Sequence, residues 1–288
     1  MKRIIVTGGS GKLGRATVKD LRANGYDVVN ADISPPSEPD PRFVRVDFED
    51  LNDTMDAFAG WDWGHTRQVD GVVHLAAIPA PGRVPAGEVM RVNTMSTYNV
   101  FETCRRLGIK NIVWASSETL LGSPFVVPPR YLPVDEEYPA RPKTAYSLSK
   151  LLGEEMARQF CEWDPEVKIV GLRFSNVKAI ADYDRFPEYE ADPASRRFNL
   201  WSYVDARDAA QAVRKALEAD IKGADVFVIA NDDTAMTTAN SELLREYFPD
   251  VSLKRSVGDH DSLLSSEKAK RILGYRPEFG WRDGVERR

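Results

Sequence analysis

Three glycines spaced three residues apart follow directly on a short apolar run near the start of the chain. The run RIIVT (Arg3 to Thr7) leads into Gly8, Gly11 and Gly14, which form a G-x-x-G-x-x-G pattern. Glycine allows a tight turn, the close approach of a pyrophosphate to the main chain, and tight packing of the next helix on the strand. The N-terminus of that helix presents unpaired N–H groups to phosphate. The pattern therefore predicts the opening of a dinucleotide-binding fold.

Short apolar runs alternate with longer helical patterns from Lys2 to about Val177. The runs expected as strands are residues 3–7, 27–31, 42–46, 71–76, 111–116 and 168–174, and helices are expected to begin near Leu13, Asn52, Gly87 and Ala145. Runs that are apolar almost throughout are typical of strands buried on both faces. We therefore expect an α/β fold, a doubly wound parallel sheet of the Rossmann type with helices on both sides.

The regular alternation weakens after Val177. A polar, Pro-containing stretch at 182–199 looks like an insertion over a site; a helix at about 206–219, a strand at 224–230 and helices near 239–247 and 266–273 follow. A chain of 288 residues can carry one such α/β unit and a smaller appendage. We expect residues 1–176, completed by about 204–231, to form the NAD-binding core. Residues 177–203 and 232–288 are expected to form a small C-terminal substrate-binding subdomain that caps the site.

A carboxylate stands where the second expected strand ends. Asp32 follows Gly14 at nearly the spacing of about 20 residues at which an acidic side chain meets the adenosine ribose hydroxyls, and it would repel a 2′-phosphate. This predicts NAD rather than NADP as the cofactor, a preference that the cations Lys12 and Arg15 reduce. Asp47, at the end of the third strand, is predicted at the adenine edge, with capping of the next helix as its alternative.

Tyr146 and Lys150 lie four residues apart at the start of a long helical pattern, on one face of the expected helix. A phenol ionises near pH 10, and a neighbouring ammonium favours the phenolate, which can then accept a proton. Ser116 and Ser117 end the fifth expected strand, at the sheet edge where ligands bind in open α/β folds. Although the spacing also fits an ordinary amphipathic helix, the combination predicts a catalytic Tyr, Lys and Ser.

Composition excludes several other classes of function. The net charge is −5 and the arginines are scattered, so nucleic acid is not expected as a partner. His65, His74 and His260 are too dispersed to suggest a metal site, and Cys104 with Cys161 is expected as a pair of buried, reduced thiols. No apolar run approaches a membrane span, and the start MKRIIVTGG does not resemble a signal peptide. We therefore expect a cytoplasmic protein without membrane association.

The motifs together resemble the extended short-chain dehydrogenase/reductases, the NAD-dependent epimerase/dehydratase family. The matching pieces are TGGSGKLG (7–14), HLAA (74–77), VNTMSTYNVFE (92–102), WASSETLLG (114–122), AYSLSK (145–150), LRFSNV (172–177), YVDARDAA (203–210) and SEKAKRILGYRP (266–277). The resemblance implies that Ser117 is the active-site serine, that Lys150 also binds the nicotinamide ribose, and that Asn93 is linked to the proton relay. It also implies a cofactor site lined by Gly8, Gly11, Lys12, Leu13, Gly14, Asp32, Asp47, Leu75, Ala76, Ala77, Tyr146 and Lys150.

The resemblance implies hydride transfer from a secondary alcohol of a sugar or sugar acid. Many epimerases have Val-Tyr-Gly after the serine and Tyr-Gly-Pro after the LRxxNV strand, where this chain has Leu120-Leu121-Gly122 and Lys178-Ala179-Ile180. These departures and the ARP segment at 140–142 resemble the corresponding segments of uronate dehydrogenases and related sugar dehydrogenases. We therefore expect a sugar or uronate dehydrogenase. A nucleotide-sugar 4-epimerase or dehydratase with tightly bound NAD is the alternative, and a non-catalytic NAD-binding sensor is a remote one.

A carbohydrate substrate is expected to meet Ser117, Glu118, Thr119 and Asn176. An anionic substrate would also need a cation, for which Arg173, Arg196 and Arg197 are candidates. The alternative role, a surface salt bridge, is the favoured one for each arginine taken singly. The helices that begin near Gly87 and Ala145 carry apolar residues around much of their circumference. Such helices need cover on more than one side, and relatives pair them, so we expect a homodimer.

Overall fold

The computed structural model describes residues 1–60, 68–125 and 127–282. Its centre is a parallel sheet whose strands run in the order β10-β7-β5-β4-β1-β2-β3. The strands of this sheet are β1 (Arg3–Thr7), β2 (Asp27–Asp32), β3 (Phe43–Arg45), β4 (Gly71–His74), β5 (Asn111–Ser117), β7 (Lys168–Phe174) and β10 (Gly223–Ile229). The strand order turns outward in both directions from β1 and β4, which confirms the predicted doubly wound fold.

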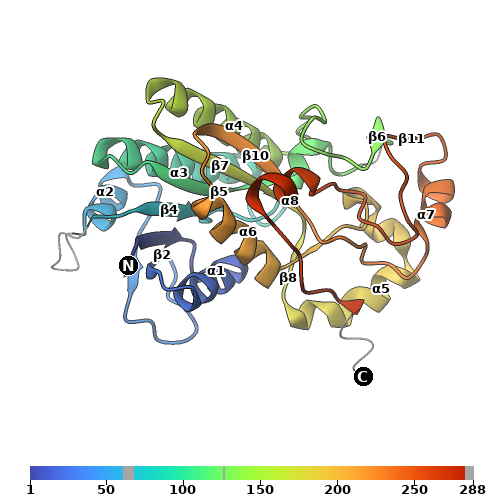
Figure 1. The fold of residues 1–288 in the computed structure, drawn as a ribbon, viewed down its shortest axis with the longest axis horizontal. Coiled ribbons are helices and arrows are strands. Elements are labelled where there is room, and N and C mark those ends of the chain that lie inside the picture. The colour runs from blue at the N-terminus through green and yellow to red at the C-terminus, as the bar shows by residue number, and fades with distance from the viewer. Residues whose placement is uncertain (61–67, 126, 283–288) are drawn as a thin grey trace.

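Helices cover both faces of the sheet (Figure 1). One face packs against α1 (Lys12–Ala23), α6 (Ala206–Glu218) and α8 (Glu267–Leu273). The other packs against α2 (Leu51–Ala59), α3 (Ala86–Leu107) and α4 (Ala145–Trp163). Successive strand residues serve opposite faces, since Ile4 and Val6 contribute to the first core and Ile5 to the second. Burial on both sides explains why these strands are apolar almost throughout.

A third core lies beyond the carboxyl ends of the strands, in the part of Figure 1 that holds α5 and α7. Its elements include β6 (Tyr131–Leu132), β8 (Val177–Lys178), β9 (Val204–Asp205), β11 (Ser252–Leu253), α5 (Phe186–Ala191) and α7 (Asn240–Tyr247), with 3-10 turns at Glu118–Leu121, Ile180–Arg185 and Pro193–Asn199. The predicted insertion at 182–199 is thus largely helical. Leu120, Leu132 and Val134, from the segment predicted to belong to the cofactor-binding core, pack here, so the predicted boundary at 176 does not coincide with the packing.

Further sequence predictions concern the cysteines, membrane spans and metal ligands. Cys104 on α3 and Cys161 on α4 are free and buried, as predicted. None of the helices in the described ranges is both long and apolar enough to cross a bilayer. His65 lies outside the described residues, and within them no cluster of three or more His, Cys, Asp or Glu side chains is arranged to hold a metal.

Candidate active site

A cleft of about 1160 Å³ opens along the carboxyl ends of the central strands. It passes over the point between β1 and β4 where the strand order reverses, the usual ligand site in open α/β sheets. The predicted site residues that line it are Gly8, Gly11, Lys12, Leu13, Gly14, Asp32, Asp47, Leu75, Ala76, Ala77, Ser117, Glu118, Thr119, Tyr146, Lys150 and Asn176. The remaining predicted residue, Asn93, stands behind this wall rather than in it.

The glycine turn has room for main chain only. Gly8 has a φ of +68°, and a Cβ on it would lie 2.6 Å from the backbone nitrogen of Ala76. A Cβ on Gly14 would lie 2.0 Å from the carbonyl oxygen of Gly8. Helix α1 begins at Lys12, within the glycine motif, and its N-cap residue Gly11 offers no side-chain acceptor to the first N–H groups. This cradle fits the pyrophosphate of a dinucleotide, because the backbone is accessible and the helix end is electropositive.

Asp32 is held at the end of β2 beside the glycine turn. Its carboxylate accepts hydrogen bonds from the backbone N–H groups of Ser10 (3.0 Å) and Ser34 (3.1 Å). Asp47 lines the same end of the cleft and accepts from the N–H of Glu49 at 3.0 Å. The capping alternative for Asp47 is wrong, because Asp50 is the residue that caps α2. Both carboxylates therefore line the cleft, and their contact with the adenosine half of NAD stays a prediction.

Ser117 is oriented by its neighbour two residues later. Its hydroxyl oxygen accepts from the hydroxyl of Thr119 at 2.9 Å and from the Thr119 backbone N–H at 3.2 Å. Burial raises the pKa of the Tyr146 phenol to about 12, while the nearby Ser117 hydroxyl acts in the opposite direction. The two hydroxyls that the sequence predicted to act on a substrate oxygen thus line the same cleft.

Lys150 is buried one turn after Tyr146. Its ammonium donates to the carbonyl oxygen of Ala115 at 2.8 Å and lies 5.7 Å from the centre of the Tyr146 ring. Burial lowers the pKa of Lys150 to about 8. Desolvation is the largest effect on the Tyr146 pKa, and the Lys150 ammonium donates to the Ala115 carbonyl; lowering of the Tyr146 pKa by this ammonium stays a prediction.

Asn93 forms a reciprocal pair with the backbone of Ile78. Its side-chain oxygen accepts from the Ile78 N–H at 2.8 Å, and its side-chain nitrogen donates to the Ile78 carbonyl at 3.1 Å. The nitrogen also reaches Ser149 at 3.4 Å. The predicted link to the proton relay is not among these contacts. Asn93 instead fixes the loop after β4, which forms one wall of the cleft.

Glu118 brings a carboxyl group to the substrate end of the cleft. It is 5% exposed, and burial raises its pKa to about 7. One of its oxygens accepts from the Asn199 side chain at 3.3 Å, and the other has no hydrogen-bond partner among the described residues. Nearby Arg196 attracts the carboxylate and thereby opposes the effect of burial. A carboxyl group that titrates near neutral pH can give or take a proton at this site.

The three candidate arginines have different environments. Arg196 is 8% exposed, and its Nε and Nη2 groups have no partner among the described residues, so its alternative role in a surface salt bridge is wrong. Its guanidinium stacks on the rings of Tyr189 and Phe198, with centroid distances of 4.9 and 4.7 Å. Arg173 is buried in an ion pair with a glutamate of α4, and Arg197 lies over the ring of Tyr247. Of the three, Arg196 is the one whose buried donors lack a partner among the described residues.

One residue that shapes the cofactor wall was not singled out from the sequence. The hydroxyl oxygen of Thr7 accepts from the backbone N–H groups of Leu75 (3.2 Å) and Ala76 (3.1 Å) and lies 2.8 Å from the His74 ring. Burial lowers the pKa of His74 to about 3, so the ring is neutral. A hydroxyl residue directly before the glycine motif is the signal that could have identified this contact.

Known protein sequences match most of the length of this chain. The sequence model of the "NAD dependent epimerase/dehydratase family" matches residues 4–230. UDP-glucose 4-epimerase from Mus musculus is 33% identical over 220 residues, which span 71% of this chain and 61% of that protein. The enzyme of the same name from Lacticaseibacillus casei is 29% identical over 96% of this chain and 92% of its own length.

Solved structures show the same fold. A UDP-N-acetylglucosamine 4-epimerase from Bacillus cereus superposes with a TM-score of 0.70 at 24% identity and covers 100% of this chain and 97% of its own. A mutated uronate dehydrogenase superposes with a TM-score of 0.68 at 21% identity, covering 100% of this chain and 86% of its own. Among the matching sequences, 4-epimerases favour the alternative function over the expected sugar dehydrogenase. The chain belongs to the NAD-dependent epimerase/dehydratase family of extended short-chain dehydrogenase/reductases, and it is an NAD-dependent enzyme.

Proposed function

We propose that the protein is a 4-epimerase of a nucleotide sugar, which oxidises a secondary alcohol at the sugar ring and then reduces the ketone from its other face. The observation that carries the proposal is that Ser117, Tyr146 and Lys150 line the same cleft as the glycine turn. The relatives named 4-epimerase supply the specific reaction, and the L. casei enzyme is matched over nearly its whole length.

The proton step follows from the geometry. Thr119 occupies the acceptor positions of the Ser117 oxygen, so the Ser117 proton is available to the substrate oxygen. Tyr146 takes the proton of the substrate hydroxyl during oxidation and returns it during reduction. NAD, when bound, accepts and returns the hydride, and its positive nicotinamide favours the phenolate. Lys150, with a pKa near 8, lies one turn further along α4 and adds positive charge when protonated.

A net dehydrogenase of a sugar acid is the second candidate, favoured by Arg196. This buried guanidinium has two unpaired N–H groups beside Glu118, which lines the cleft. Burial of an unpaired cation is costly, so a substrate carboxylate would be a favourable partner for it. The replacement of Val-Tyr-Gly by Leu120-Leu121-Gly122 also agrees with this candidate.

One incubation separates the candidates. The purified protein and excess NAD are mixed with UDP-sugars, free sugars or uronates, and both NADH and sugar configuration are followed. Isomerised UDP-sugar without NADH supports the epimerase, whereas net NADH with a uronate supports the dehydrogenase. Tyr146→Phe should abolish either activity and leave NAD affinity largely intact; Tyr26→Phe, whose hydroxyl donates to Glu218 outside the cleft, is the matched control. NAD binding without hydride exchange in the whole panel would indicate a sensor.

We also propose a homodimer through α3 and α4. These helices pack against each other and leave large apolar side chains exposed, namely Met95, Tyr98, Leu107, Leu148, Leu152 and Trp163. An apolar surface across two neighbouring helices is favourably covered by a second copy of itself. Light scattering should give twice the monomer mass, and Leu152→Asp should give the monomer mass. A monomeric wild-type protein would overturn this proposal.

A further inference from the structure

Four consecutive residues of β5 contact four residues of α4. A Cβ on Gly153 would lie 2.5 Å from the Trp114 ring, Lys150 donates to the Ala115 carbonyl, and the Ser117 hydroxyl is near enough to the Tyr146 phenol to lower its pKa. The fourth contact joins Ser116 to Glu154, whose carboxylate accepts from the serine hydroxyl at 2.7 Å. Contacts between α4 and β5 therefore extend from Tyr146 and Ser117 to Glu154, two turns further along α4.

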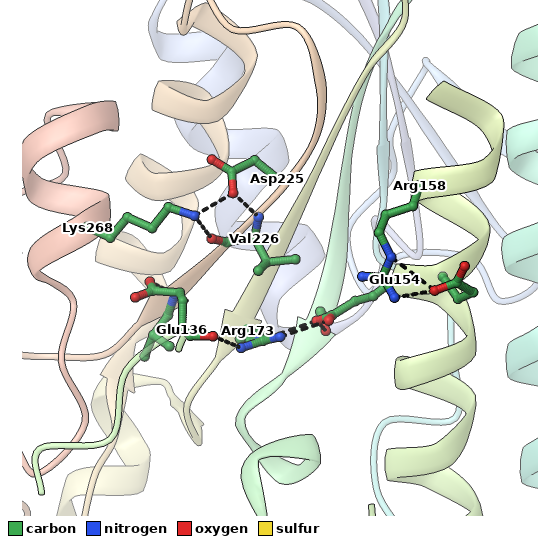
Figure 2. Close-up of polar contacts among 10 residues, drawn as sticks. Glu136, Glu154, Arg158, Arg173, Asp225, Val226 and Lys268 are labelled. Atoms are coloured by element: carbon green, nitrogen blue, oxygen red, sulfur yellow. Dashed lines mark hydrogen bonds and ion pairs between the residues drawn. The ribbon is translucent and has the colours of Figure 1, made fainter. Parts of the chain in front are cut away.

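The Glu154 contact differs from the others because it includes a third element. Arg173 on β7 donates to both oxygens of Glu154, from Nε and Nη2, each at 2.9 Å (Figure 2). The Glu154 side chain is 2% exposed, and the Arg173 side chain is 7% exposed. Arg173 also reaches the Glu136 carbonyl at 3.4 Å, and the Glu136 carboxylate accepts from the Val228 N–H of β10 at 2.7 Å. One carboxylate thus links α4 to β5 and β7, and indirectly to β10.

Because of its position on α4, this link can change where the reacting groups lie. Tyr146, Lys150 and Glu154 follow one another at four-residue intervals on the same face of α4. Tyr146 lies two turns from Glu154, about 12 Å along the helix axis. A tilt of the helix by about 5° at Glu154 would displace Tyr146 by about 1 Å, and a displacement of about 1 Å can slow catalysis about 100-fold.

We propose that Glu154 is a positioning residue that sets the separation between Tyr146 and Ser117 by joining α4 to β5 and β7. The inference rests on the proposed catalytic roles of those two hydroxyls. Glu154 touches neither of them and does not line the described cleft. Its effect is mechanical, since Ser116 and Arg173 fix the helix to the strand that carries Ser117.

The test removes the link without leaving a buried charge. In the variant Glu154→Leu/Arg173→Met both charges are lost, and such apolar replacements of buried ion pairs are often neutral for stability. The matched control is Arg3→Met/Asp27→Leu, an ion pair of the same 2.9 Å length with side chains 4% and 9% exposed, at the amino ends of β1 and β2. Glu155→Gln, next to Glu154 but paired with exposed Arg158, tests the outer face of α4.

Two measurements are made on each full-length protein: the single-turnover rate of hydride transfer to NAD at saturating sugar, and the separation of the Tyr146 and Ser117 oxygens in a crystal structure. We expect the Glu154→Leu/Arg173→Met variant to slow hydride transfer at least about 10-fold, with unchanged NAD affinity and a separation larger by about 1 Å. Both controls should match the wild type. Ser116→Ala, which keeps the ion pair, should show a smaller change in the same direction and serves if the double variant does not fold.

An unchanged rate in a folded double variant would overturn the inference, and so would a slower rate with an unchanged oxygen separation. If the wild-type protein transfers hydride from no sugar in the panel, the proposed function fails. The oxygen separation then still decides whether Glu154 positions Tyr146.

Discussion

The hydroxyl of Thr119 donates to the hydroxyl oxygen of Ser117 at 2.9 Å, and the Thr119 backbone N–H donates to the same oxygen at 3.2 Å. Both acceptor positions of Ser117 are therefore occupied by one neighbour. The serine can then act toward the cleft only as a donor, which suits an oxygen that gains negative charge when its proton leaves.

Thr119→Val should weaken this restriction of Ser117 to the role of a donor. The backbone N–H remains, but the hydroxyl donor is lost, so the Ser117 hydroxyl can rotate and present its oxygen to the substrate. Loss of one hydrogen bond worth about 1 kcal/mol predicts a decrease in kcat of about 5- to 10-fold, with little change in NAD affinity. Steady-state kinetics would measure it. Thr119→Ser keeps the hydroxyl and should retain most activity; equal losses in the two variants would contradict the explanation.

Glu118 should make stability depend on pH. Burial raises its folded-state pKa to about 7 from an ordinary value of 4.5, so between these pH values the folded chain holds a proton that the unfolded chain releases. The free energy of unfolding therefore falls as pH rises through this window. Relative to Glu118→Gln, the wild type should lose up to about 3 kcal/mol between pH 4.5 and 7.

Urea denaturation at several pH values would measure this difference. The control Glu188→Gln replaces a glutamate on α5 whose side chain is 62% exposed, and it should leave the pH dependence of the wild type intact. Parallel curves for wild type and Glu118→Gln would show that the Glu118 carboxyl does not titrate abnormally.

Asp32→Ala should change the choice of cofactor. Loss of charge-assisted hydrogen bonds to the adenosine ribose predicts about 10- to 100-fold weaker NAD binding, and removal of the negative charge should improve NADP binding relative to NAD. Calorimetric titration with both cofactors would measure this. Asp40→Ala, which removes a carboxylate paired with Arg22 outside the cleft, is the control. Equal weakening of NAD and NADP binding would indicate that Asp32 only maintains the glycine turn.

Gly153→Ala should separate α4 from β5. The added methyl group would lie 2.5 Å from an atom of the Trp114 ring, which is buried and has little room to move. Overpacking of this kind costs about 1 to 3 kcal/mol of unfolding free energy. Gly87→Ala on α3, where a Cβ meets nothing within 4 Å, should be neutral or stabilising. Urea denaturation compares the two, and equal stability would contradict the packing argument.

The central sheet could be predicted because its signals are local. The strand expected at 168–174 is β7, with the same bounds, and α4 begins at Ala145 as expected. Runs of β-branched residues bounded by turn residues indicate buried strands whatever lies on either side of them. The glycine turn could be located for the same reason, since the adjoining strand and helix are its sequence neighbours.

Contacts between distant segments could not be predicted in this way. Nothing in the sequence around Asn93 indicates that its amide pairs with the backbone of Ile78. Likewise Arg196 lies in a polar stretch, and its burial depends on rings that the fold brings around it. The side-chain chemistry of such residues is visible in the sequence, but their partners are fixed by tertiary packing.

The buried ion pair of Glu154 and Arg173 also limits which substitutions this sequence can accept during evolution. Replacement of either residue alone leaves a charge without a partner inside the protein, a change that commonly costs about 3 to 5 kcal/mol. Descendants of this chain should therefore exchange the two residues together or keep both. The Arg158 and Glu155 pair one position along α4 is open to water, so each of its members is free to vary by itself.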